Sequence, residues 1–328
     1  MSNAALNIIH KANSTKDKYN ILTFNTHERY QTQLAKTEHN FYAFVPEGTK
    51  EWFNGHGNIP SNYYILPKNA IYTGINFDMI LSQSKFGQFQ TVQHINSRLQ
   101  LPVISLEHTL PISNWPQQQL QQFQTMVGDL NIFISEFSAK AWNVNGPTEV
   151  IRHSIDSELF KPGNDQREAR VLSVAHDFIN RDYCLNYSGW QRITDGLNKM
   201  VIGDTPGLSK QSESVEDLVT EYQKSQVFLN TSTLSPIPMA LLEAMSCGCG
   251  IVTTETCMIP EIVEHGVNGL MSNNEEELRE YTQQLLNDAE LSKKLGEEAR
   301  KTIKEKLSEQ KFIDNWNKIF DKAYGVNK

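Results

Sequence analysis

The residues whose types are best suited to ligand binding or catalysis lie between Ser235 and Gly250. Pro236 and Pro238 stand just before an apolar run that predicts a short helix over Met239–Ser246, and a glycine-rich turn follows it. The first amides of a helix lack partners within the helix, and with the helix dipole they favour a bound anion. This segment therefore predicts a phosphate site at the start of a helix.

Glu243 is the carboxylate of this otherwise apolar helix. Burial of a carboxylate costs free energy unless hydrogen-bond donors satisfy it. A pair of ribose hydroxyls is one such set of donors, whereas a neighbouring backbone group or a cation would give the residue a structural role. The residue types alone leave both interpretations open.

The composition is that of a folded protein with two domains. The chain has 328 residues, of which 39% are hydrophobic and 21% charged, and one domain per roughly 150 residues is usual. Against 30 Lys and Arg residues stand 38 Asp and Glu residues, which gives a formal net charge of -8. A field of this sign repels phosphate backbones, so nucleic acid is not an expected partner.

The sequence also disfavours a membrane-spanning protein and a disulfide-rich one. No apolar run approaches the ~20 residues that a membrane-spanning helix needs, so we expect no integral membrane segment. Met1–Ala4 lacks the apolar core of a signal peptide and resembles an expression scar. The four cysteines, Cys184, Cys247, Cys249 and Cys257, are too few for a disulfide framework in so long a chain. We therefore expect free thiols and a cytoplasmic protein.

Short apolar runs alternate with helix-length stretches in the first half. This alternation predicts a parallel sheet covered on both faces, the doubly wound arrangement. The predicted strands are Asn20–Phe24, Phe41–Val45, Phe77–Leu81, Pro102–Leu106, Leu130–Ile134 and Thr148–Arg152. Gln117–Gln124 predicts the surface of an amphipathic helix.

A second alternating series follows a linker-like segment, Ser157–Arg170. Its predicted strands are Val171–Ala175, Met200–Gly203, Gln226–Leu229 and Gly250–Thr253. Helices are predicted over Val215–Lys224 and Met239–Ser246, and Glu275–Tyr324 is helical by apolar spacing. The fold class is therefore α/β, with two Rossmann-like doubly wound domains.

Two segments resemble a known family. Ser235–Gly250, continued by Ile259–Leu270, resembles the C-terminal signature of the family 4 retaining glycosyltransferases, and Val150–Pro162 resembles that family's interdomain crossover. The resemblance implies a GT-B fold, in which two Rossmann-like domains face each other across a cleft. We expect an acceptor-side domain over 1–160, a nucleotide-sugar donor domain over 161–305, and a C-terminal helix over 306–328, for which packing against the N-terminal domain is one arrangement.

The resemblance also implies roles for single residues. Glu243 would bind the donor ribose, and Ser235 would be catalytic. Ser235 stands where the family has a second acidic residue, and a hydroxyl cannot supply a carboxylate's charge. Arg181 would neutralise the diphosphate, with His176 as a weaker second group; a surface ion pair of Arg181 with Asp177 or Asp182 is the alternative.

The remaining assignments complete the expected site. His108 follows the strand Pro102–Leu106, at the strand end where open α/β sheets bind ligands, and would be catalytic; a structural histidine is the alternative. Gly203, Ser232 and Pro238 are assigned to donor binding. The chain lacks an Asp-x-Asp signature, and the cysteines lack zinc spacing, so no metal site is expected.

The implied activity is the transfer of a sugar from a nucleotide diphosphate sugar to an acceptor hydroxyl, on a glycan or lipid-linked saccharide, with retained configuration. The nucleotide sugar is a co-substrate, and no cofactor is implied. Because Ser235 replaces an acidic residue, a catalytically silent sugar-nucleotide binding protein is one alternative. Transfer to an unusual acceptor, such as a hydroxylated nucleic-acid base, is another.

Overall fold

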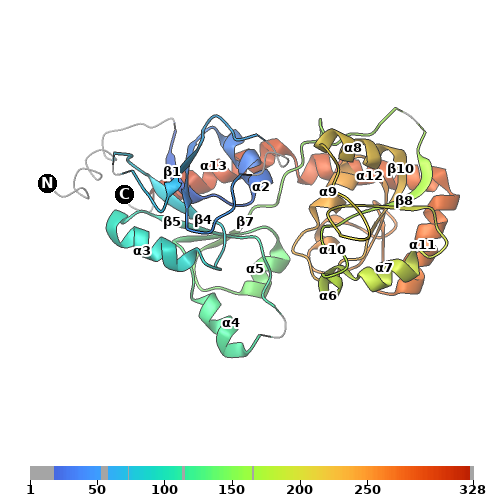
Figure 1. The fold of residues 1–328 in the computed structure, drawn as a ribbon, viewed down its shortest axis with the longest axis horizontal. Coiled ribbons are helices and arrows are strands. Elements are labelled where there is room, and N and C mark those ends of the chain that lie inside the picture. Colours follow the sequence, from blue (N-terminus) through green and yellow to red (C-terminus); the bar gives the residue numbers. More distant parts are fainter. Residues whose placement is uncertain (1–17, 53–57, 73, 113–114, 165, 326–328) are drawn as a thin grey trace. The chain divides into compact units, whose positions relative to one another are not determined.

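The computed structural model describes residues 18–52, 58–72, 74–112, 115–164 and 166–325. Residues 1–17, where we expect no signal peptide, lie outside the described residues. The chain forms two units (Figure 1). The first comprises Met1–Ile134, Ala139–Arg152 and Phe312–Lys328, and the second comprises Ser135–Ser138 and His153–Lys311. The second unit thus takes in residues 153–160, which the sequence analysis assigned to the first domain.

The first unit is built on a seven-stranded sheet in the order β3-β2-β1-β4-β5-β6-β7, with every neighbouring pair parallel. Its strands are β1 (Asn20–Phe24), β2 (Asn40–Val45), β3 (Tyr63–Lys68), β4 (Met79–Ser82), β5 (Val103–Glu107), β6 (Leu130–Phe133) and β7 (Thr148–Val150). The chain runs outward from β1 to β3 and returns to β4 beside β1, so β1 and β4 flank the topological switch point. This is the predicted doubly wound arrangement.

Strand β3 is absent from the sequence prediction. It lies at the edge of the sheet, and only Tyr63 and Leu66 of its residues are buried. An edge strand needs no continuous apolar run and tolerates a proline such as Pro67, so its pattern is weak.

Helices of the first unit include one from the far end of the chain. The helical elements before the second unit are α2 (Glu28–Leu34), η1 (Ala35–Thr37), α3 (Phe89–Leu99), α4 (Gln117–Gln124) and α5 (Glu136–Trp142), the last shared between the units. Helix α13 (Glu309–Gly325) lies beside α2 in Figure 1, and Trp316 Nε1 donates a hydrogen bond to the Tyr30 hydroxyl at 3.0 Å. Tyr19 also donates to Asp321 at 2.7 Å. The last helix is therefore part of the first unit's core.

The second unit contains a five-stranded parallel sheet in the order β12-β11-β10-β8-β9. Its strands are β8 (Glu168–Val174), β9 (Lys199–Ile202), β10 (Ser225–Asn230), β11 (Gly250–Thr253) and β12 (Leu270–Met271). The four predicted strands are present, with ends that differ by a few residues. The two-residue strand β12 is too short to leave a sequence pattern.

Seven helices are described in the second unit. They are α6 (Asp182–Leu185), α7 (Tyr187–Ile193), α8 (Val215–Lys224), α9 (Met239–Ser246), α10 (Ile259–Ile262), α11 (Glu275–Asn287) and α12 (Ala289–Lys306). The bounds of α8 and α9 are those predicted from the sequence. The stretch predicted as helical over Glu275–Tyr324 is divided into α11, α12 and α13. The first break falls at Asp288, which caps α12 by accepting a hydrogen bond from the Leu291 amide.

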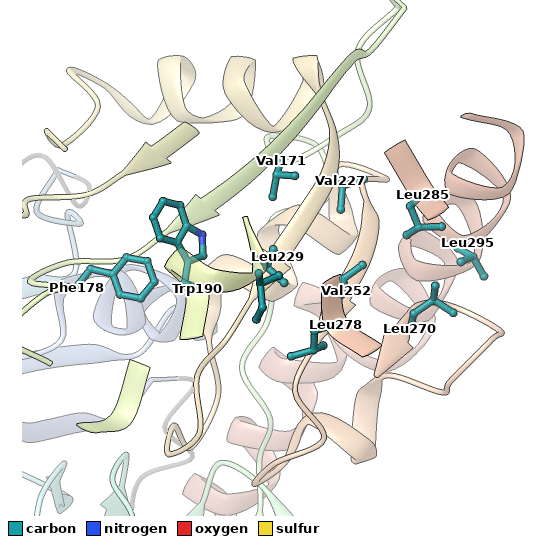
Figure 2. Close-up of a cluster of buried hydrophobic side chains, with 11 residues drawn as sticks. Val171, Phe178, Trp190, Val227, Leu229, Val252, Leu270, Leu278, Leu285 and Leu295 are labelled. Atoms are coloured by element: carbon teal, nitrogen blue, oxygen red, sulfur yellow. The ribbon is translucent and has the colours of Figure 1, made fainter. Parts of the chain in front are cut away.

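A buried apolar cluster holds this sheet to its helices (Figure 2). Val171, Val227 and Val252 come from three adjacent strands and pack with Leu278 and Leu285 of α11. On the β8 side, Trp190 of α7 extends the cluster, and its Nε1 donates to Ser173 Oγ at 3.0 Å. This packing therefore holds the strands, and the loops at their ends, in fixed positions. Among the described residues no helix has both the length and the apolarity to cross a membrane.

Candidate functional site

The loops that follow the parallel strands of the second unit meet at one edge of the sheet. Parallel strands place all their carboxyl ends together, and ligands of open α/β sheets bind there. The loops after β8, β9, β10 and β11 are joined by hydrogen bonds, and every residue predicted for donor binding except Glu243 lies in these loops or at the start of α9.

Gly203 brings the loops after β8 and β9 into close contact. Its φ is 136°, and a Cβ atom at this position would lie 1.9 Å from the carbonyl oxygen of Ala175. The next residue, Asp204, donates its amide to His176 Nδ1 at 3.0 Å. His176 Nδ1 is therefore an acceptor, so in the neutral ring the proton is on Nε2. Glycine is required here for the two loops to pack.

Arg181 is an exposed residue directly before α6. Both carboxylates of the alternative ion pair have other partners: Asp177 accepts from Asn180 at 2.6 Å, and Asp182 accepts from the amide and hydroxyl of Ser188 at 2.7 and 2.9 Å. The Ser188 donors hold the pKa of Asp182 below its usual value. Within the described part of the chain, neither carboxylate forms an ion pair with Arg181.

The helix that Arg181 precedes is bonded to the loop after β10. The carbonyl of Cys184 accepts from the amides of Thr233 and Leu234 at 2.9 and 3.2 Å. Ser232, which is buried, accepts at its own carbonyl from the hydroxyl of Thr254, in the loop after β11. The structure thus links the surroundings of Arg181 and Ser232 through short backbone contacts.

The start of α9 carries Ser235 and Pro238. Pro238 is the N-cap residue, and no side chain caps this helix end. The Pro238 carbonyl accepts from the amides of Leu241 and Leu242 at 3.0 and 3.4 Å. Ser235 is partly exposed in the preceding loop. An uncapped helix start of this kind presents amide donors to an anion.

Glu243 has a partner that the sequence analysis missed. The side chain is only 3% exposed, and its Oε2 accepts a hydrogen bond from the Tyr222 hydroxyl at 2.9 Å. Tyr222 comes from α8, and nothing in the local sequence pairs the two residues, because the contact depends on how α8 and α9 pack.

In the first unit, His108 follows β5 at the carboxyl edge. Its ring lies 4.2 Å from the ring of His27 and 4.6 Å, edge to face, from that of Tyr30. Burial lowers the pKa of His27, although Glu28 opposes this, which favours the neutral form of the ring that lies tilted against His108. Neither His27 nor Tyr30 was singled out from the sequence; their position after β1, beside the switch point, was the available signal.

Glu107, the residue before His108, holds the residue that follows His108 and joins this loop to the loop after β4. Its Oε1 accepts from the amide and hydroxyl of Thr109 at 2.9 and 2.7 Å, and its Oε2 accepts from the amide of Lys85 at 2.8 Å. Trp142 Nε1 in turn donates to the Thr109 carbonyl at 2.8 Å. The loops after β4 and β5 are therefore joined around His108.

The cysteines are free thiols, with Cys247 and Cys249 buried. Within the ranges that the structure describes, no group of three or more His, Cys, Asp or Glu side chains is arranged to hold a metal ion.

Comparison with known proteins finds a family match within the second unit. Residues 208–302 match the family model described as glycosyl transferases group 1. This segment is similar to the group 1 glycosyl transferases. The matched segment contains Ser232, Ser235, Pro238 and Glu243, whereas His108, His176, Arg181 and Gly203 lie before it. The family resemblance of the sequence is confirmed.

Individual proteins are also similar to this chain in sequence. The N-acetyl-alpha-D-glucosaminyl L-malate synthase of Bacillus anthracis is 30% identical over 115 residues, which cover 34% of this chain and 29% of that enzyme. The chain therefore spans less than a third of that relative's length in the match. An uncharacterized glycosyltransferase of Methanocaldococcus jannaschii is 29% identical over 282 residues, which cover 79% of each chain.

The fold is also that of a solved structure. Anabaena HepE, in complex with UDP and glucose, superimposes with a TM-score of 0.74 at 14% identity, over 93% of this chain and all of that one. The chain therefore has the GT-B fold that the sequence predicts.

Proposed function

We propose that this protein transfers a sugar from a nucleotide diphosphate sugar to a hydroxyl of a glycan or lipid-linked saccharide, with retention of configuration at the anomeric carbon. One observation carries the proposal: the loops after β8, β9, β10 and β11 are bonded into one edge, which gathers His176, Arg181 and the start of α9. At this edge, Arg181 supplies a cation and the first amides of α9 supply donors for a diphosphate. Glu243, further along α9, supplies a carboxylate for the ribose hydroxyls of the same nucleotide.

The leaving diphosphate is the group whose charge must be stabilised. In the proposed site, Arg181 binds its oxygens with a planar guanidinium, and the first amides of α9 bind it beside Ser235. Glu243 accepts hydrogen bonds from the ribose hydroxyls. Gly203 lets the backbone approach the nucleotide closely, and His176 offers its Nε2 proton.

His108 orients the donor sugar or the acceptor hydroxyl in this proposal. The bonds of Glu107 to Thr109 and Lys85 hold its loop, and His27 and Tyr30 pack on its ring. Such support keeps a reacting group in one orientation. The free cysteines suit a reducing compartment, so we place the activity in the cytoplasm.

A silent nucleotide-sugar binding protein is the second candidate, and Ser235 favours it. The hydroxyl of Ser235 can form a hydrogen bond to a sugar. Unlike a carboxylate, it cannot stabilise the positive charge that develops on the sugar ring in the transition state. The two candidates share the binding site and differ in whether a sugar is transferred.

A two-step experiment tests both. UDP-, GDP- and ADP-sugars are screened by thermal shift, where a ligand at 100 times its dissociation constant stabilises by about 2.7 kcal/mol. The bound donor is then mixed with neutral saccharide and lipid-linked acceptors, and free nucleoside diphosphate is measured. Release that Glu243→Gln and Arg181→Gln reduce supports transfer. Binding without release supports the silent protein, and no binding by any donor refutes both.

A further inference from the structure

Tyr222 is a fully buried tyrosine whose hydroxyl has no assigned role. It lies near the end of α8, and its hydroxyl donates to Glu243 Oε2 of α9 at 2.9 Å. Because the two residues come from different helices, the bond fixes the carboxylate relative to the sheet and not only within its own helix.

The tyrosine is itself held in place. Its carbonyl accepts from Arg167 Nη1 at 2.6 Å and from the Cys249 thiol at 3.1 Å. Its ring packs against those of Phe160 and Phe228, with centroids 6.3 and 5.9 Å away. The hydroxyl therefore has a defined position and cannot follow a moving carboxylate far.

The direction of the hydrogen bond is set by protonation. Burial raises the pKa of Tyr222 well above its usual value, and the charge of Glu243 raises it further, so the phenol keeps its proton and donates. The guanidinium groups of Arg167 and Arg300 donate to backbone carbonyls, those of Cys247 and Ser246 among them. These cations hold the backbone, while the phenol binds the carboxylate.

We infer that Tyr222 is a positioning residue: by holding Oε2 of Glu243, its hydroxyl orients the carboxylate to receive the hydroxyls of the nucleotide ribose. The inference rests on the proposed function, in which Glu243 binds that ribose. Two ribose hydroxyls require a carboxylate in one orientation, and an acceptor oriented before binding loses less conformational entropy when the ligand arrives.

The test compares ribose with deoxyribose. The probes are the nucleoside diphosphate selected by the donor screen and its 2′-deoxy and 3′-deoxy forms, with dissociation constants measured by calorimetry. The wild type should bind the ribose form about tenfold more tightly, as expected for one hydrogen bond to a charged group. In Tyr222→Phe, we expect the ribose form to bind about tenfold more weakly and its advantage over the deoxy forms to fall to roughly threefold or less.

The opposite mechanism makes a different prediction. In the opposite mechanism, the Tyr222 hydroxyl occupies the Glu243 carboxylate only while no ribose is bound. Removing that hydroxyl then leaves the carboxylate without a donor until a ribose binds, so the affinity advantage of the ribose form over the deoxy forms rises. An unchanged or increased advantage in Tyr222→Phe therefore overturns the inference.

Tyr63→Phe is the matched control. Tyr63 is also buried and donates to the Phe24 carbonyl at 3.2 Å, but it belongs to the first unit. Both variants keep the aromatic ring, and thermal midpoints check that both fold. Loss of ribose preference in Tyr63→Phe as well would show a general effect of losing a buried hydroxyl, and would refute the positioning role.

Glu243→Gln separates this inference from the proposed function. With Glu243→Gln the ribose advantage should fall, and adding Tyr222→Phe should change it no further. A wild type that binds all three probes equally refutes the ribose role and the inference together. A wild type that discriminates, with loss in Glu243→Gln but not in Tyr222→Phe, keeps the ribose role and refutes the positioning role alone.

Discussion

Gly203→Ala should damage the loop edge of the second unit far more than an ordinary glycine replacement. The added Cβ would lie 1.9 Å from the Ala175 carbonyl oxygen, whereas real Cβ contacts are essentially never under 3.0 Å. The two loops must therefore separate by about 1 Å, or the backbone must leave its φ of 136°.

The cost follows from the bonds that this separation breaks. Asp204 donates to His176 Nδ1 at 3.0 Å and accepts from the Asp177 amide at 2.8 Å, and neither bond survives such a shift. Two hydrogen bonds at about 1 kcal/mol each, with about 1–3 kcal/mol of strain at a φ that residues with a side chain rarely adopt, give a destabilisation of about 3–5 kcal/mol.

The assay is urea unfolding at 25 °C, monitored by tryptophan fluorescence. Nucleotide affinity is measured separately under native conditions. Trp190 donates to Ser173 Oγ in β8, so its emission reports on this sheet. Gly207→Ala is the control, because Gly207 has a φ of +84° but no atom within 4 Å of an added Cβ. It should lose only the strain, about 1–2 kcal/mol. Equal losses in the two variants would refute the close-approach argument.

Three further predictions concern separate residues. Arg181→Gln should weaken binding of a nucleoside diphosphate by about tenfold, leave the nucleoside unaffected, and change stability by under about 0.5 kcal/mol; an equal loss for both ligands would exclude a diphosphate contact. Burial lowers the pKa of Lys85 to about 8. Between pH 8 and 10.5, Lys85 therefore binds more protons in the unfolded chain than in the folded one, and the free energy of unfolding should rise by roughly 3 kcal/mol relative to that of Lys85→Met. A difference between the two proteins that does not change with pH would contradict the burial of the charge. Trp316→Ala should cost about 3–5 kcal/mol in calorimetry, because Trp316 is fully buried and bonded to Tyr30; a loss under 1 kcal/mol would place α13 outside the core.

Much of the fold could be predicted because its signals are local. Helix α8 begins where the Ser214 hydroxyl accepts from the Asp217 amide, and α9 begins after Pro238, so both bounds follow from a few adjacent residues. Strands β3 and β12 could not be predicted. The first is an edge strand with two buried residues, and the second has only two residues, so neither leaves a periodic pattern.

The candidate site was predictable only in part, for the same reason. The sequence alone singled out Glu243, since an acidic residue in an apolar helix is conspicuous, and the family signature placed it with Ser235. It also placed His108 after a predicted strand, at the strand end where open α/β sheets bind ligands.

Only the tertiary structure decided what surrounds those residues. It set Tyr222 against Glu243 and brought the Ala175 carbonyl so close to Gly203 that no side chain fits there. It also packed the rings of His27 and Tyr30 against that of His108. Each of these contacts joins residues from different elements. Their distances depend on how helices and loops pack on the sheets, which no local pattern of residue types records.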